Sequence, residues 1–234
     1  VLKNNMLTTQ IKRSEYKYIV NKKDLPKILF FLSRFAKPDL SYADPITKSY
    51  VVHSIYFDTP TLKYYFEKIY GIMKRKKFRL RQYHTKTHGK SNIFAEIKYK
   101  HGAVITKERI QLEANTIKQQ SDMYSIDNAF RHLYIQDTLR PTTLISYTRQ
   151  PLIGIQHPHI RITIDRDLQS CIPNDFTFTQ TNSTLLTDQA IIELKYHTYL
   201  PTWVNMFIKI FSLQQTSYSK YCAGLQHIRP TLTK

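Results

Sequence analysis

Charged side chains recur at every second position in several short segments of the sequence. Arg79 and Arg81 alternate with Phe78 and Leu80, a spacing that points both arginines to one side of an extended chain. The pattern predicts a shared face with cations suited to phosphate oxygens and carboxylates suited to a divalent metal. Its cations are Lys17, Arg79, Arg81, Lys98, Lys107, Arg109, Arg149, Arg161, Lys195 and, from a later segment, Lys220, and its carboxylates are Glu15, Glu96, Asp165 and Glu193.

The segments that carry these residues are predicted to be strands of one sheet, joined by further strands over Val51–Phe57 and Thr143–Arg149. About eight mostly antiparallel strands suffice to close a barrel. We therefore predict a mainly β (α+β) fold, an eight-stranded antiparallel β-barrel tunnel with a charged lumen. No linker or repeat divides the chain, which indicates a single domain over residues 1–234. Apolar stripes predict helices packed outside, over Leu25–Ala36, Pro60–Ile69, Thr116–Ile135 and Pro201–Leu213.

The alternative to a tunnel is an open amphipathic sheet whose charged face is simply solvated. Such a face would mix the two signs more evenly and would use more Ser, Thr and Gln. Crowded cations repel one another by about 4 kcal/mol per pair at about 4 Å for an effective dielectric constant of about 20. The predicted lumen therefore needs an anion, and a linear polyphosphate or a nucleoside triphosphate tail would meet that need.

Composition points to an anionic partner and excludes several kinds of site. The 234 residues contain 35 Lys and Arg against 17 Asp and Glu, a formal net charge of +18. Five scattered glycines exclude the phosphate-binding and dinucleotide-binding glycine motifs, and two cysteines without C-x-x-C spacing indicate a reducing compartment. The longest apolar run, Ile28–Leu32, is too short to span a membrane. His157 and His159 are more typical of a solvated loop than of a metal site.

Short motifs follow one another along almost the whole chain. They are E-Y-K-Y (15–18), S-I-Y-F-D-T (54–59), K-F-R-L-R (77–81), F-A-E-I-K (94–98), T-K-E-R (106–109), S-Y-T-R (146–149), R-I-T-I-D (161–165), I-E-L-K-Y (192–196) and Y-S-K-Y (218–221). In this order and spacing they resemble the polyphosphate polymerase (VTC) domain of the triphosphate tunnel metalloenzyme, or CYTH-like, superfamily.

The resemblance implies a phosphotransferase that moves the terminal phosphoryl group of a nucleoside triphosphate, expected to be ATP, onto a growing inorganic polyphosphate chain. It also implies assistance by a divalent metal, Mn²⁺ or Mg²⁺. Glu193 would hold the metal, with Glu96 and Glu15 as further candidate ligands, and Lys220 would close the tunnel wall. Carried over by motif, the catalytic phosphate contacts would be Lys17, Arg79, Arg81, Lys98, Arg149, Arg161 and Lys220, and Lys107, Arg109 and Lys195 would also bind substrate in the lumen.

One position departs from the pattern of hydrolytic members, which carry E-x-E-x-K on the first strand. Arg13 stands where the first glutamate would be, so activation of water is less supported than transfer to a phosphate acceptor. A metal-dependent triphosphatase on the same fold remains the alternative.

A non-catalytic polyanion-binding or nucleic-acid-binding protein is a further alternative. Most strand aromatics fall on the apolar phase, whereas a base-stacking platform would place them among the cations. We therefore expect ATP and inorganic polyphosphate as partners, and no nucleic acid. We also expect a cytoplasmic location, without a transmembrane segment and with membrane association only through a partner protein.

Overall fold

Ten strands form one antiparallel sheet in the structure, a computed structural model. The structure describes residues 7–10, 14–84, 92–102, 104–113, 117, 119–126, 128–173, 176, 178, 185–186, 188–197 and 199–233. The strands are β1 (Leu7–Gln10), β2 (Ser14–Asn21), β3 (Ala36–Pro38), β4 (Tyr50–Asp58), β5 (Lys74–His84), β6 (Asn92–His101), β7 (Val104–Leu112), β8 (Arg140–Gly154), β9 (Arg161–Cys171) and β10 (Gln189–Tyr196).

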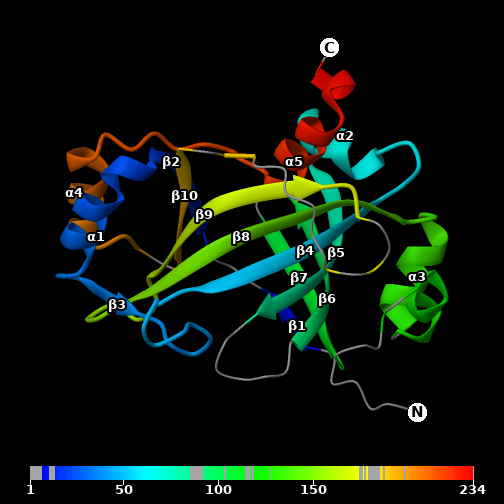
Figure 1. Cartoon of the computed structure of the whole chain (residues 1–234), viewed down its shortest axis with the longest axis horizontal. Coiled ribbons are helices and arrows are strands. Elements are labelled where there is room, and N and C mark those ends of the chain that lie inside the picture. The colour runs from blue at the N-terminus through cyan, green and yellow to red at the C-terminus, as the bar shows by residue number, and fades with distance from the viewer. Residues whose placement is uncertain are drawn as a thin grey trace.

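The sheet is open, although it is strongly curved. Its strand order is β1-β7-β6-β5-β4-β8-β9-β10-β2, with β3 beside β8. Figure 1 shows β10 and β2 as one wall, β5, β6 and β7 as the other, and the long strands β4, β8 and β9 between them. The mainly antiparallel β fold is therefore confirmed, whereas the predicted closed barrel of eight strands is corrected to an open sheet of ten.

A segment that follows the last strand occupies the outer edge of β2. Tyr18 forms an isolated antiparallel bridge with Gln215, and the Thr216 amide donates to the Lys17 carbonyl at 2.8 Å. This pairing satisfies hydrogen-bonding groups of the β2 backbone. In a closed barrel, β1 or another strand would have paired with those groups. Arg13, whose substitution for glutamate entered the sequence analysis, lies outside the described residues.

Five α-helices and three short 3₁₀ helices accompany the sheet among the described residues. Thr116–Ile135 was predicted as one helix, but its described part contains two, a 3₁₀ helix that ends at Ser125 and an α-helix that begins at Asn128. The other three predicted helices are present and shorter than expected. Those near Leu25 and Thr202 end earlier, at Leu32 and Ile210, and the third begins only at Lys63, after Leu62 in the left-handed region. The helices are η1 (Lys22–Asp24), α1 (Leu25–Leu32), α2 (Lys63–Ile69), η2 (Gln120–Ser125), α3 (Asn128–Gln136), α4 (Thr202–Ile210), α5 (Lys220–Ile228) and η3 (Pro230–Thr233).

Apolar side chains of the strands pack beneath helices on the outer face of each wall. Ile162 of β9 is buried with Phe207 of α4 in a cluster that also includes α1, and Phe78 of β5 is buried with Phe130 of α3. In Figure 1, α1 and α4 lie at the left end of the molecule and α3 lies at the right. Because side chains alternate along a strand, the charged phase is left on the inner face. This division between an apolar outer face and a charged inner face was predicted from the alternation of residues along the strands.

Helix α5 packs on the inner side of the sheet and was not predicted. Its Leu225 is buried against Tyr56 of β4 and Ile145 of β8. The approach is close at Gly224, where an added Cβ would lie 2.1 Å from Ile145 Cδ1 and 3.3 Å from Ser170 Cβ. Glycine thus lets the helix contact the sheet directly. None of the helices in the described ranges is long and apolar enough to cross a membrane.

Candidate functional site

The inner face of the curved sheet encloses a cavity of about 890 Å³. Among the described residues that line it are fourteen lysines and arginines and four carboxylates, and the helix α5 contributes to one end. Of the residues predicted for the shared face, Asp165 is fully buried and lies outside this lining. The residues predicted to bind substrate or metal or to act in catalysis all belong to it: Glu15, Lys17, Arg79, Arg81, Glu96, Lys98, Lys107, Arg109, Arg149, Arg161, Glu193, Lys195 and Lys220. The structure therefore brings together positions that the sequence spreads over more than 200 residues.

Glu96 of β6 organises the cations of one wall. Register places Arg79 of β5 and Arg109 of β7 directly opposite it on either side. Its carboxylate accepts from Arg79 Nε at 2.7 Å and contacts the Lys107 ammonium, with Arg109 Nε at 3.4 Å and Arg81 more distant at 3.9 Å. Burial would raise the pKa of Glu96, but Arg79 and Arg81 hold it well below its usual range. Glu96 is therefore an ionised counter-charge at neutral pH.

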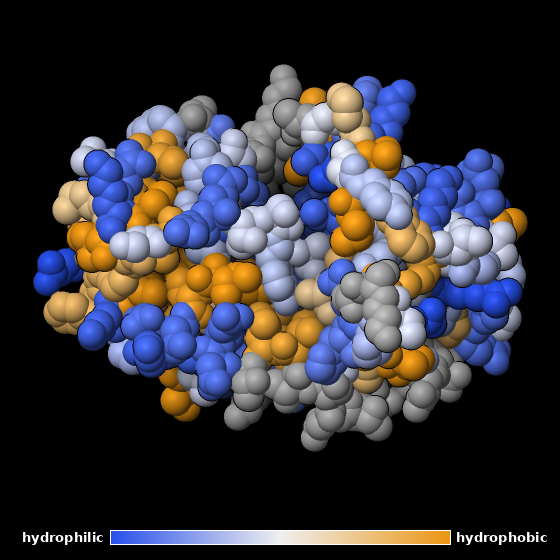
Figure 2. Space-filling view, turned by 90° about the horizontal axis from the view of Figure 1, so that it is seen from above, coloured by the Kyte–Doolittle hydropathy of each residue, from blue (hydrophilic) through white to orange (hydrophobic). Residues whose placement is uncertain are grey.

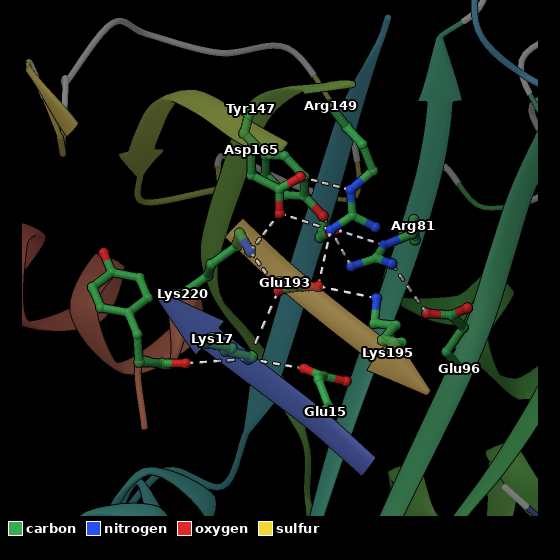
Figure 3. Close-up of polar contacts among 12 residues, drawn as sticks. Glu15, Lys17, Arg81, Glu96, Tyr147, Arg149, Asp165, Glu193, Lys195 and Lys220 are labelled. Atoms are coloured by element: carbon green, nitrogen blue, oxygen red, sulfur yellow. Dashed lines mark hydrogen bonds and ion pairs between the residues drawn. The ribbon is translucent and has the colours of Figure 1, made fainter. Parts of the chain in front are cut away.

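Glu193 and Asp165 organise the cations of the opposite wall (Figure 3). Arg149 forms a bidentate pair with Asp165, at 2.6 and 2.7 Å, and lies 3.4 Å from Glu193. Lys195 lies 3.0 Å and Lys17 3.7 Å from Glu193. Burial would raise the pKa of Glu193, but the surrounding lysines hold it well below its usual range. Each carboxylate thus keeps several cations in place.

Lys220, which was expected to close the tunnel wall, is the first residue of α5 and lines the cavity. The Ser219 side chain caps this helix by accepting from the Cys222 amide. Lys220 Nζ lies 2.6 Å from Asp165 and 2.8 Å from Glu193. Burial would lower its pKa, but these two carboxylates raise it above the usual range. A helix N-terminus therefore delivers the ammonium group to the cavity.

A hydrogen bond between Tyr221 and Asp58 fixes the position of α5. The Tyr221 hydroxyl donates to the buried Asp58 carboxylate, which also accepts from the backbone amides of Tyr64 and Tyr65 at the start of α2. Asp58 therefore links α5, α2 and the end of β4. Asp58 and Tyr221 each belong to a motif recognised in the sequence. Their contact was not predicted, because the two residues are 163 positions apart.

Lys77 and Lys98 lie opposite one another on β5 and β6, and neither makes an ion pair with any described residue. Burial lowers the pKa of Lys77 to about 8, and burial also lowers that of Lys98. Lys77 donates to the Ser219 hydroxyl at 2.9 Å. Lys77 was not among the predicted site residues, although it shares the phase of Arg79 and Arg81 and could have been included. Both lysines therefore line the cavity without a carboxylate partner among the described residues.

Two predicted positions differ in environment from the rest. The Arg161 side chain is 59% exposed and lies 4.0 Å from Asp39, so it is at the edge of the cavity rather than inside. The Arg109 guanidinium stacks over the Phe94 ring, 3.6 Å from its centroid. Tyr56, Tyr83 and Tyr147 also line the cavity, whereas strand aromatics were predicted to fall mostly on the apolar phase. Aromatic rings and cations are therefore mixed in this site.

Two carboxylates of the lining, Glu15 and Glu193, are candidates to hold a divalent metal. No group of three His, Cys, Asp or Glu side chains suited to a metal occurs among the described residues. Burial and the nearby Glu193 carboxylate act to raise the pKa of Glu15, but Lys195, Lys17 and Lys98 lower it to about 2. Lys17 Nζ lies within 4 Å of both carboxylates. Mg²⁺ is commonly held by one or two carboxylates together with substrate phosphates, so this pair fits. Glu96 and Glu193 each face four cations, with which a bound metal would have to compete.

Comparison with known proteins assigns the family. The model of the VTC domain matches residues 12–229. The chain belongs to the VTC domain family. The match contains all thirteen predicted site residues and confirms the resemblance found in the motifs. No curated protein matches the chain.

One solved structure with a TM-score above 0.5 shares the fold at low sequence identity. A putative adenylate cyclase from Bacillus halodurans is 12% identical, with a TM-score of 0.54 over 89% of this chain and 96% of that one. A putative adenylate cyclase from Vibrio parahaemolyticus is 13% identical, with a TM-score of 0.49 over 92% and 98%. The PH1819 protein from Pyrococcus horikoshii is 11% identical, with a TM-score of 0.47 over 89% and 96%.

Proposed function

We propose that this VTC domain is a polyphosphate polymerase that transfers the terminal phosphoryl group of ATP to inorganic polyphosphate within the cavity. The observation that carries the proposal is the excess of cations over carboxylates in the cavity lining, with Lys77 and Lys98 left without an ion pair. A chain of phosphates supplies negative charge at regular intervals and would relieve repulsion along the whole lining.

The arginines are suited to hold the phosphates in line. In phosphoryl transfer the charge is spread over oxygens, and the protein mainly positions the reactants and stabilises that charge. Arg79 and Arg81 alternate on β5 and their planar forks can each bind two phosphate oxygens. Tyr56 and Ser54 orient them, at 3.1 Å from Arg79 and from Arg81 respectively. Both forks are thus held before substrate arrives.

The lysines act as point charges beside the reacting groups. Lys195 and Lys220 contact Glu193 from two elements, and Lys17 approaches it from β2. Glu15 and Glu193 would hold a Mn²⁺ or Mg²⁺ ion, which when bound neutralises charge on phosphate oxygens. The acceptor is already an ionised phosphate, so no strong general base is required.

Product analysis tests this proposal. Purified protein is incubated with ATP labelled in its terminal phosphate and with Mn²⁺ or Mg²⁺, and labelled polymer is separated from free phosphate on a gel. We expect label in polymer. If the label appeared in free phosphate alone, the protein would be a triphosphatase and not a polymerase. If ATP were not turned over but tripolyphosphate still bound, the protein would be a non-catalytic binding module.

A matched pair of variants ties the activity to the cavity. Lys98→Ala removes a lining cation that has no ion-pair partner among the described residues, so no carboxylate is left unpaired. We expect polymer formation to fall at least about tenfold. Lys27→Ala removes the same charge from the exposed surface of α1 and should leave it unchanged. Equal losses in both would indicate a nonspecific charge effect.

A further inference from the structure

Large apolar side chains are exposed together beside one end of the cavity. Ile69 and Tyr70 end α2, Ile72 and Met73 follow in the turn to β5, and Val104 begins β7. These five residues, here called the lip, are 47–72% exposed. Isolated exposed apolar residues are common on protein surfaces, whereas several that adjoin one another mark an interaction surface.

Backbone contacts show that the lip is contiguous. The Gly102 amide donates to the Met73 carbonyl at 3.2 Å, and a Cβ on Gly102 would lie 3.9 Å from Met73 Cε. His101 pairs with Val104 across the β6–β7 hairpin, and the Ile72 amide donates to the Glu67 carbonyl. The turn after α2 and the tip of the hairpin therefore present their apolar side chains side by side.

Four cations border the lip: Lys68, Lys74, Arg75 and Lys100. No carboxylate of the described residues forms an ion pair with any of them. Burial lowers the pKa of Lys100, and repulsion from Arg75 and Lys68 lowers it further, so these cations lie close enough to need an anionic neighbour. Glu67, the nearby acid on α2, is half-buried and accepts from the Lys76 amide instead.

We propose that the lip and its four cations dock the protein on an anionic lipid surface. Exposed apolar side chains can enter the boundary between headgroups and acyl chains, while lysines and arginines around them bind anionic headgroups. In Figure 2 the right half of the face, which carries α2 and α5, sets apolar side chains among hydrophilic ones. The mixture matches a lipid interface better than a flat apolar protein partner, which would leave the four cations without counter-charges.

Docking at the lip would place the cavity beside the lipid surface. Lys68, Arg75 and Lys100 belong to both the border of the lip and the lining of the cavity. The inference does not depend on polymerase activity, because it rests on surface residues and can be measured without ATP.

Vesicle co-sedimentation tests the proposal. Protein is mixed with vesicles of phosphatidylcholine alone or of phosphatidylcholine with phosphatidylglycerol, with and without saturating tripolyphosphate. We expect binding to the anionic vesicles only, and we expect tripolyphosphate to leave most of the protein bound. Equal binding to both kinds of vesicle, or no binding, would overturn the proposal. Full release by tripolyphosphate would assign the binding to the cavity instead.

Variants locate the binding surface. Ile72→Ser with Met73→Ser should lower the partition coefficient at least about tenfold, and Lys68→Ala with Lys74→Ala should do the same. Phe30→Ser with Ile210→Ser is the matched control, because these side chains are 68% and 58% exposed on α1 and α4 at the other end of the molecule. Unchanged melting temperatures verify folding. Wild-type binding by the lip variants, or an equal loss in the control, would contradict the docking surface.

Discussion

Glu96 and Glu193 each contact several cations, which explains how so many lysines and arginines lie together. Glu96 forms ion pairs with Arg79 and Lys107, while Glu193 forms ion pairs with Lys195 and Lys220. Because one carboxylate is shared by several lysines and arginines, few of these cations are fully neutralised. A polyanion can therefore bind the same lysines and arginines in place of the carboxylates. The site is therefore assembled before it is filled.

Two lysines make polyanion binding sensitive to mildly alkaline pH. Burial lowers the pKa of Lys77 to about 8 and that of Lys107 to about 8. Both are charged below this value and lose their protons as the pH rises through it. We expect tripolyphosphate affinity, measured by calorimetry between about pH 7 and about pH 9, to fall more steeply in wild type than in Lys77→Arg, which stays charged. Lys27→Arg is the control, and parallel pH profiles for all three proteins would contradict the assignment.

Lys77 affects the stability of the folded protein in the opposite direction to its effect on ligand affinity. A lysine with a depressed pKa binds fewer protons in the folded than in the unfolded protein between about pH 8 and its usual value of 10.5. Stability contributed by Lys77 therefore rises with pH over that window while ligand affinity falls. Melting temperatures of wild type and Lys77→Arg, measured without ligand, would separate these two effects.

Glu15 is the carboxylate whose loss should affect metal use most selectively. Its carboxylate is partly exposed and pairs only with Lys17 among the described residues. We expect Glu15→Gln to raise the Mn²⁺ concentration that gives half-maximal turnover at least about fivefold, without lowering metal-free tripolyphosphate affinity. Asp39→Asn removes the same charge near Arg161 and should leave the metal requirement unchanged. An equal rise in both variants would show that Glu15 is not a ligand.

At the scale of elements, α5 is held against the sheet by one close contact and one buried hydrogen bond. Gly224→Ala would bring a methyl group against Ile145 and Ser170, which are both buried. We expect the free energy of unfolding to fall by about 1–3 kcal/mol, as for other overpacked cores. Polymer formation should fall as well, because the shift of α5 moves Lys220. Denaturant unfolding and the gel assay measure the two effects.

The control is Asn205→Ala, which changes an exposed side chain of α4 and should alter neither quantity. Unchanged stability and turnover in Gly224→Ala would show that the sheet yields at Ile145 and that the close contact is not required.

The strands were predictable because alternation of charged and apolar residues is a local property. Arg79, Glu96 and Lys195 fall on the predicted face for that reason. Helix α5 was missed, although Ser219 is a typical N-cap and Tyr221, Cys222 and Leu225 form a stripe, because a glycine and the neighbouring motif obscured its period. The link from Asp58 to Tyr221 depends on tertiary packing, which the sequence pattern does not contain.

At the scale of the molecule, an open sheet replaces the predicted closed barrel. Strand number can indicate that closure is feasible, but closure requires hydrogen bonds between the terminal strands. Here β1 and β2 are the ends of the sheet, and the segment at Gln215 pairs with β2. The cavity is completed by α5 and this segment, so the charged face points inward as predicted without a continuous ring of strands.

Calorimetric titration with tripolyphosphate, without metal or ATP, tests the central claim that this cavity binds a linear polyphosphate. We predict one molecule bound per chain, an affinity that falls steeply with salt, and a loss of at least about tenfold in Lys98→Ala but not in Lys27→Ala. Several weak sites, or equal affinity in the two variants, would mean that the positive charge acts over the general surface and would contradict a polyphosphate-binding cavity.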